Sequence, residues 1–168
     1  MSNAIPEAPY TVLNKLESNV EIREYPAQIW AIVKGRQQNE AFKILTDYIF
    51  GKNEQQTKIG MVVPFITFGS GEGREVALIM PNAYRLRTLP KPYRDDIKLE
   101  SMAPKKMAVI TFSGSVTPDT FDGNLRLLEE ILKKHGTIWK GPPYLLQYNE
   151  PRTPPFMRRN EAAIQIDH

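Results

Sequence analysis

Aromatic and cationic side chains gather in one proline-stiffened stretch near the end of the chain, Tyr148–Glu161. Arg152 and Arg158 supply positive charge, and Met157 is among the apolar residues. Such side chains form an apolar floor with cationic, hydrogen-bonding edges. We therefore predict that this stretch lines a site for a flat, apolar, acidic ligand, with the Tyr148 phenol able to donate to a carboxylate. Each arginine has a simpler alternative as a solvated surface residue.

Glu161 predicts a different chemistry, the binding of an organic cation. A carboxylate at the start of a strand can hold such a cation by charge, and neighbouring aromatic rings add cation–π attraction. The rings expected around Glu161 are Tyr144, Tyr148, Trp139 and Phe156. The structural alternative is that Glu161 forms an ion pair with Arg158 or Arg23.

Composition narrows the other possibilities. The 168 residues contain no cysteine and two histidines, which excludes disulfides, thiolate nucleophiles and cysteine-ligated metals. The sequence has no nucleophile elbow and no carboxylate pair at a recognisable spacing, so we do not expect an enzyme. The net charge is +3, but 22 basic residues are interleaved with 19 acidic ones, which gives no support for nucleic-acid binding.

No apolar stretch is long enough to span a membrane, and the start of the chain lacks a signal-peptide pattern. We therefore expect a cytoplasmic, soluble monomer without a membrane partner. The length suits a single domain over residues 1–168. Residues 1–7 are expected to be disordered or derived from an expression tag.

The hydrophobic pattern predicts two helices and about eight short strands. One helix is expected at 39–51, and a second at 117–136, where Thr-Pro-Asp forms an N-cap sequence and cations precede a closing glycine. The strands are expected at 10–13, 20–25, 27–33, 58–68, 75–80, 97–99 and 106–112, with two more within 144–166.

Both halves of the chain, about 10–92 and 97–168, follow the order strand, helix, strand, strand. This order predicts an α+β fold: a distorted antiparallel or mixed β-barrel of about eight strands, built from two βαββ halves and flanked by two helices. Closure would remove the edges that these Val- and Ile-rich strands otherwise expose. The halves share scarcely any identity, so duplication is a hypothesis about architecture.

Six short stretches carry a resemblance to a known family. They are Glu21–Tyr25, Ile59–Pro64, Met80–Pro81, Leu89–Pro92, Phe112–Gly114, and Tyr148–Pro151 with Arg158–Glu161. Together they resemble the SOUL haem-binding protein family, in the family's order and over residues 10–166. The resemblance implies a compact barrel-like fold of two βαββ halves. It also implies a haem or other tetrapyrrole ligand on an apolar surface beside the first helix, with basic residues for the propionates.

The family has no settled enzymatic reaction, so the resemblance implies a non-catalytic carrier, buffer or sensor of tetrapyrroles. Its barrel is also similar to GyrI-like ligand-binding domains, in which an acidic residue on a late strand meets cationic aromatic compounds. Two alternatives therefore stay open. One is a binder of such compounds through Glu161, and the other is a protein-interaction module without a small ligand.

Under this resemblance the first helix supplies the apolar platform, since Phe42 and Thr46 lie one helical turn apart. Phe42 has an alternative role in the core, because apolar stripes on helices usually indicate burial. The expected ligand contacts are Asn39, Phe42, Lys43, Thr46, Met61, Tyr148, Arg152, Met157 and Arg158.

Haem usually also needs an axial iron ligand. His135 lies in the cationic last turn of the second predicted helix, where a favourable interaction with the helix dipole explains it without iron. His168 ends the chain. We therefore expect weak ligation by Tyr148 or Met61, or by no side chain, and mostly hydrophobic binding.

Overall fold

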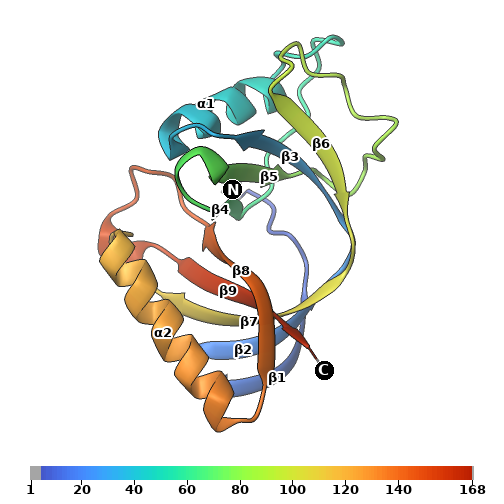
Figure 1. The fold of residues 1–168 in the computed structure, drawn as a ribbon. Helices are drawn as coiled ribbons and strands as arrows, with labels where there is room; N and C mark the ends of the chain where they lie inside the picture. The colour runs from blue at the N-terminus through green and yellow to red at the C-terminus, as the bar shows by residue number, and fades with distance from the viewer. Residues whose placement is uncertain (1–4, 168) are drawn as a thin grey trace, which may run out of the picture. The chain divides into compact units, whose positions relative to one another are not determined.

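The computed structural model describes residues 5–167 (Figure 1). They fall into two compact units. Unit 1 comprises the residues up to Ala8 together with Ala27–Ala103, and unit 2 comprises Pro9–Pro26 together with the residues from Pro104 onward. His168 lies outside the described residues, as do residues 1–4.

Unit 1 is an antiparallel sheet with one helix packed on it. Its strands lie in the order β4-β5-β3-β6. Helix α1 packs on β3 and β5 through apolar side chains at helical spacing, among them Leu45, Tyr48 and Ile49. The elements are β3 (Gln28–Lys34), α1 (Gln38–Ile49), β4 (Phe65–Phe68), the 3₁₀ turn η1 (Gly71–Gly73), β5 (Glu75–Ile79) and β6 (Ile97–Met102).

Unit 2 repeats this plan with a longer sheet, in the order β1-β2-β7-β9-β8. Helix α2 lies along this sheet (Figure 1) and buries Leu128 and Leu132 against it. Thr117 caps the helix by accepting from the Thr120 amide, and Pro118 occupies the first turn. The elements are β1 (Thr11–Glu17), β2 (Val20–Tyr25), β7 (Lys105–Phe112), α2 (Pro118–Lys134), β8 (Ile138–Gln147), the 3₁₀ turn η2 (Pro155–Met157) and β9 (Asn160–Asp167).

The units match element by element, with β3-α1-β4-β5 corresponding to β7-α2-β8-β9. Each adds a strand from an unexpected place in the chain. Strand β2 directly precedes β3 but pairs with β7, and β6 precedes β7 but pairs with β3. The compact units therefore differ from the predicted halves, because β1 and β2 come from the start of the chain and belong to unit 2.

The α+β class, the antiparallel pairing, the βαββ order and the two helices are confirmed. Among the described residues β1 pairs only with β2 and β6 only with β3, so the strand order is open at these two strands. The hairpin of β4 and β5 is also confirmed.

The strand predicted at 58–68 is wrong over its first part, since only Phe65–Phe68 is a strand. The preceding segment instead closes the end of α1, where the Ile59 amide donates to the Ile49 carbonyl. Gly60 then adopts a positive φ of 101°, which is outside strand geometry. Val63 forms an isolated parallel bridge with Glu7.

Candidate functional site

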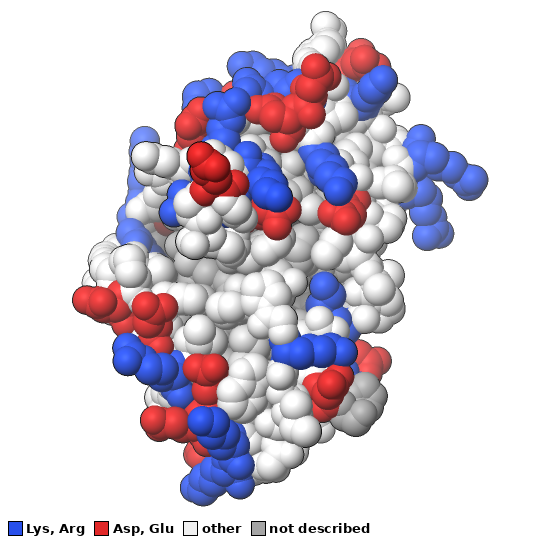
Figure 2. Space-filling model, viewed as in Figure 1, with Lys and Arg blue, Asp and Glu red and all other residues white. Residues whose placement is uncertain are grey.

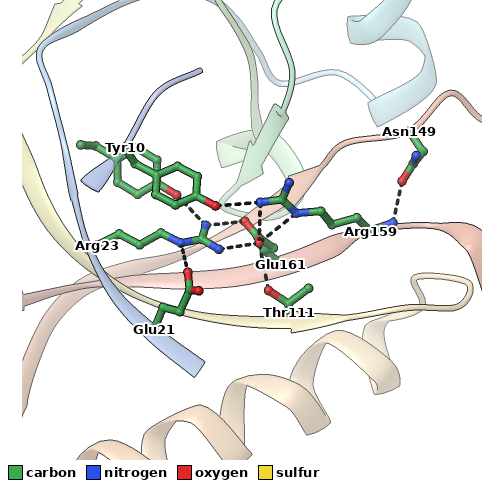
Figure 3. A network of polar contacts seen from close by, with 8 residues as sticks. Tyr10, Glu21, Arg23, Thr111, Asn149, Arg159 and Glu161 are labelled. Carbon is green, nitrogen blue, oxygen red and sulfur yellow. Dashed lines mark hydrogen bonds and ion pairs between the residues drawn. The ribbon is translucent and has the colours of Figure 1, made fainter. Parts of the chain in front are cut away.

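The carboxylate of Glu161, near the start of β9, is fully buried, at 0% exposed. Arg23 on β2, at 2% exposed, donates to its two oxygens at 2.7 and 2.8 Å. Thr111 on β7 donates to Oε2 at 2.9 Å. The three side chains come from neighbouring strands of unit 2 and point toward one another (Figure 3). The structural alternative predicted for Glu161, an ion pair with Arg23, is the arrangement observed.

Tyrosine rings and a second arginine complete this network. The Arg23 guanidinium lies 4.0 Å from the Tyr10 ring centroid and donates to the Tyr25 hydroxyl at 2.9 Å. Arg159 lies 3.8 Å from the Tyr148 ring centroid, and donates to the Tyr10 hydroxyl and to the buried carboxylate. The guanidinium groups therefore occupy the aromatic faces that an organic cation would use.

The charges of the pair reinforce each other. Burial alone would raise the pKa of Glu161, but hydrogen bonds and charge from Arg23, with the charge of Arg159, hold that pKa below its ordinary value. Burial likewise opposes the charged form of Arg23, yet the hydrogen bond and charge of Glu161 raise its pKa. Both groups stay ionised at neutral pH, so the carboxylate is already neutralised within the chain.

Tyr148 stands beside this carboxylate, with its hydroxyl buried. Burial raises the pKa of the Tyr148 phenol, and the negative charge of Glu161 raises it further. The tyrosinate needed for iron ligation is therefore strongly disfavoured. The aromatic partners Tyr10 and Tyr25 were not predicted in this cluster, although Arg23 and Tyr25 share one face of an alternating strand in the sequence.

Arg158 holds the loop between β8 and β9 together. It donates to the backbone carbonyls of Thr153 and Pro151 at 2.8 and 2.9 Å. These bonds favour a structural role for Arg158 over the predicted propionate contact. Arg152 and Met157, on the same loop, are exposed.

The aromatic set predicted around Glu161 is brought together only in part, since Tyr148 lies beside the carboxylate and Trp139 does not. Trp139 on β8 pairs with Ile166 of β9, which places it about 16 Å along the strand from Glu161, at about 3.3 Å per residue. There Trp139 packs on the core of unit 2 beneath α2. Tyr144 is nearer, opposite Ala163, but the Lys105 ammonium lies 5.8 Å from its ring centroid.

In unit 1, the four predicted platform residues of α1 lie on one outward face of the helix, because their spacing repeats every three or four residues. Phe42 is half-buried at the edge of this face, with its ring centroid 4.7 Å from that of Phe65. It therefore serves the core and offers part of its ring outside. Phe50, at the C-terminal end of the helix, continues the face and is 56% exposed. The platform residues are Asn39, Phe42, Lys43 and Thr46.

Cations line this outer face of α1. Lys43 and Lys52 both pair with Asp47, at 3.1 and 3.6 Å. The Lys58 ammonium lies 5.6 Å from the Phe50 ring centroid. Apolar rings and exposed cationic groups therefore share one accessible face. Of these three lysines, Lys43 alone was predicted as a ligand contact. Phe50 was not predicted, although it follows Thr46 by one helical turn on the same face.

A buried asparagine shapes the loop that carries two of these lysines. Asn53 is fully buried and donates to the carbonyls of Tyr48 and Thr57, at 3.1 and 2.8 Å. The Thr57 amide donates back to the Asn53 side chain at 3.2 Å. These bonds fold the chain after α1 into a tight loop. Lys52 lies near Asp47 of the helix, and Lys58 lies over the Phe50 ring.

Met61, one of the two side chains predicted as weak iron ligands, is not an exposed donor, and His135 was not expected to bind iron. Met61 is half-buried against the core of unit 1. His135 is exposed at the C-cap of α2, as its helix-dipole role requires. Within residues 5–167, no group of three or more His, Cys, Asp or Glu side chains could hold a metal ion.

A model of the SOUL heme-binding protein family matches residues 5–165. The chain belongs to this family. Among SOUL relatives, Heme-binding protein 2 from Homo sapiens is 28% identical over 145 residues, which cover 78% of this chain and 70% of that protein. The described part of this SOUL chain has no helix long and apolar enough to cross a membrane.

Two solved structures share the fold of this SOUL chain. A hydrolase from Listeria innocua superposes with a TM-score of 0.66 at 13% identity, over 90% of this chain and 93% of that one. The C-terminal domain of EcmrR superposes with a TM-score of 0.61 at 10% identity, over 94% and 98%. At such identities the likeness shows the fold alone, since one fold can carry unrelated functions.

Proposed function

We propose that this chain binds haem or a related tetrapyrrole as a non-catalytic carrier, buffer or sensor. The observation that carries the proposal is the outer face of α1, where the exposed ring of Phe50 and the edge of Phe42 lie among lysines. A tetrapyrrole has a broad apolar ring and carboxylates at its edge, and such a face offers partners for both.

Membership of the SOUL family supports the ligand class, and the structure supports a mode of binding. Phe42 and Phe50 provide apolar contact, and Lys43 and Lys52 provide cations for the propionates. Arg152 and Met157 are exposed on the loop between β8 and β9 of unit 2, and they remain candidate contacts apart from the α1 platform. Arg158 is a weaker candidate, because its guanidinium is held by the loop backbone.

Binding should depend little on iron. Tyr148 keeps its proton because its pKa is raised, and Met61 packs on the core. If neither ligates iron, recognition rests on the ring and its carboxylates, and metal-free protoporphyrin should bind about as well as haem.

The alternative of a cation binder acting through Glu161 has less support. Two arginines and a threonine already donate to its carboxylate, and the aromatic faces beside it are covered by those arginines. An external cation would have to displace a buried, bidentate guanidinium.

Titration with hemin tests the proposal. We expect a saturable change in the Soret band at about one equivalent, as a single platform requires. His135→Ala should leave the titration unchanged, because the position of that residue at the C-cap of α2 explains it through the helix dipole and not through iron. A linear, non-saturating response at micromolar protein would reject tetrapyrrole binding.

A further inference from the structure

The outer face of α1 already holds one carboxylate, that of Asp47. Its Oδ2 atom receives the Lys43 ammonium at 3.1 Å from one turn earlier in the helix. The Lys52 ammonium approaches the same oxygen at 3.6 Å from the loop that follows the helix. The hydrogen bond to Lys43 and the charges of both lysines hold the pKa of Asp47 below its ordinary value, so it is ionised at neutral pH.

These contacts are exchangeable. The side chains of Lys43 and Lys52 are 74% and 72% exposed, and that of Asp47 is 35% exposed. Ion pairs in water at such exposure contribute only about 0–1 kcal/mol. An ammonium group also carries more N–H donors than one carboxylate oxygen occupies. The two lysines can therefore turn to another carboxylate at small cost.

The same face of α1 offers an apolar surface, the Phe50 ring, at a distance from the lysine pair that a tetrapyrrole can span. Phe50 follows Lys43 by two helical turns, about 10 Å along the axis at about 1.5 Å per residue. Lys58 lies over the Phe50 ring, and buried Asn53 fixes the loop that bears Lys52 and Lys58. A ligand whose ring covers Phe50 would bring its edge carboxylates to the lysine pair.

We infer that Asp47 occupies the carboxylate-binding position of this face, and that a ligand propionate replaces it on Lys43 and Lys52. This inference rests on the proposed tetrapyrrole function and identifies the residue that sets its specificity. Asp47 keeps the two lysines paired without ligand and lowers the affinity for anionic tetrapyrroles. A ligand with esterified carboxylates gains nothing from displacing it.

The test is Asp47→Asn, which keeps the shape and removes the charge. Metal-free protoporphyrin IX should bind this variant about two- to five-fold more tightly than the wild type, the range for one exposed charge pair. The gain should shrink as salt rises. It should be absent for the dimethyl ester of protoporphyrin IX, which tests the carboxylate directly.

Asp122→Asn is the matched control. Asp122 is an exposed aspartate on α2, and the substitution changes the net charge by the same amount. Equal affinities for the two variants would overturn the role of Asp47 while leaving tetrapyrrole binding intact. An equal gain for the porphyrin and its ester would overturn it too. If the wild type and both variants fail to bind either porphyrin, the proposed function itself is wrong.

Discussion

Two regions of the molecule each place one carboxylate between two cations, and they differ in burial and in the type of cation. In unit 2, Glu161 is held by Arg23 and Arg159 inside the sheet, with no exposed surface (Figure 3). In unit 1, Asp47 is held by Lys43 and Lys52 on the outside of a helix. The first arrangement is rigid and closed, whereas the second is open to exchange.

Side-chain type explains part of the difference. A guanidinium forms a planar fork that matches both carboxylate oxygens, whereas an ammonium is a strongly hydrated point charge on a flexible stem. On the face of the molecule seen in Figure 2, positive and negative side chains are interleaved over most of the charged surface. Accessible lysines beside an exposed ring, rather than the strongest ion pair, therefore mark the better candidate for a ligand site.

The largest effect should come from breaking the buried pair. Arg23→Met leaves the Glu161 carboxylate buried without its bidentate partner, so we expect a loss of about 3–5 kcal/mol in the free energy of unfolding. The double variant Arg23→Met/Glu161→Leu removes both charges and should recover much of that loss. Urea unfolding measures both values. Additive losses in the double variant would show that the two side chains do not act as a pair.

The same pair should make stability depend on acid. The folded-state pKa of Glu161 lies below its ordinary value of 4.5, so its contribution is complete above that value and is lost as pH falls through the lowered pKa. The urea concentration at the unfolding midpoint should therefore decrease as the pH is lowered from about 5 to about 2. The double variant without the pair should show a shallower fall, and an identical profile would contradict the assignment.

Much of the fold follows from local sequence signals. Alternation predicted β2, and the helical period with a Thr-Pro cap predicted α2. The exchange of β2 and β6 was not predictable in this way, because pairing between distant strands leaves no mark in a local hydrophobic pattern. The segment before Pro64 was misread since its apolar residues serve the core without forming a ladder.

The candidate site was predicted in part for the same reason. The helical spacing predicted that Phe42 and Lys43 share a face of α1. In the structure Lys43 is exposed on this face and Phe42 is half-buried at its edge. Around Glu161, spacing along the chain suggested Trp139, but the register of β8 and β9 carries that ring to the far end of the strand. Arg23, one of the two arginines predicted as an ion-pair partner of Glu161, reaches it because β2 pairs with β7 and β7 pairs with β9.

A smaller effect should appear at the open face of α1. Phe50→Ala removes an exposed ring, so stability should change by no more than about 0.5 kcal/mol. Loss of ring contact should weaken protoporphyrin binding by about two- to ten-fold, the usual range for an aromatic pair. Tyr93→Ala is the control, because Tyr93 lies in the same unit and is as exposed as Phe50. Equal losses for both variants would argue against a specific platform.

The smallest effect concerns a single lysine, and it separates an exchangeable cation from a structural one. Lys52→Met keeps most of the apolar stem and removes the ammonium, so protoporphyrin should bind about two- to five-fold more weakly at low salt. The difference should fade as ionic strength rises, because an exposed charge is screened.

Lys98→Met is the matched control, since Lys98 is equally exposed on β6 and pairs with Glu100 at 3.8 Å. If the two variants lose affinity equally, general positive charge rather than the face of α1 attracts the ligand. A loss confined to Lys52 and sensitive to salt would assign the carboxylate contact to the open region and leave the buried Glu161 pair as a purely structural element.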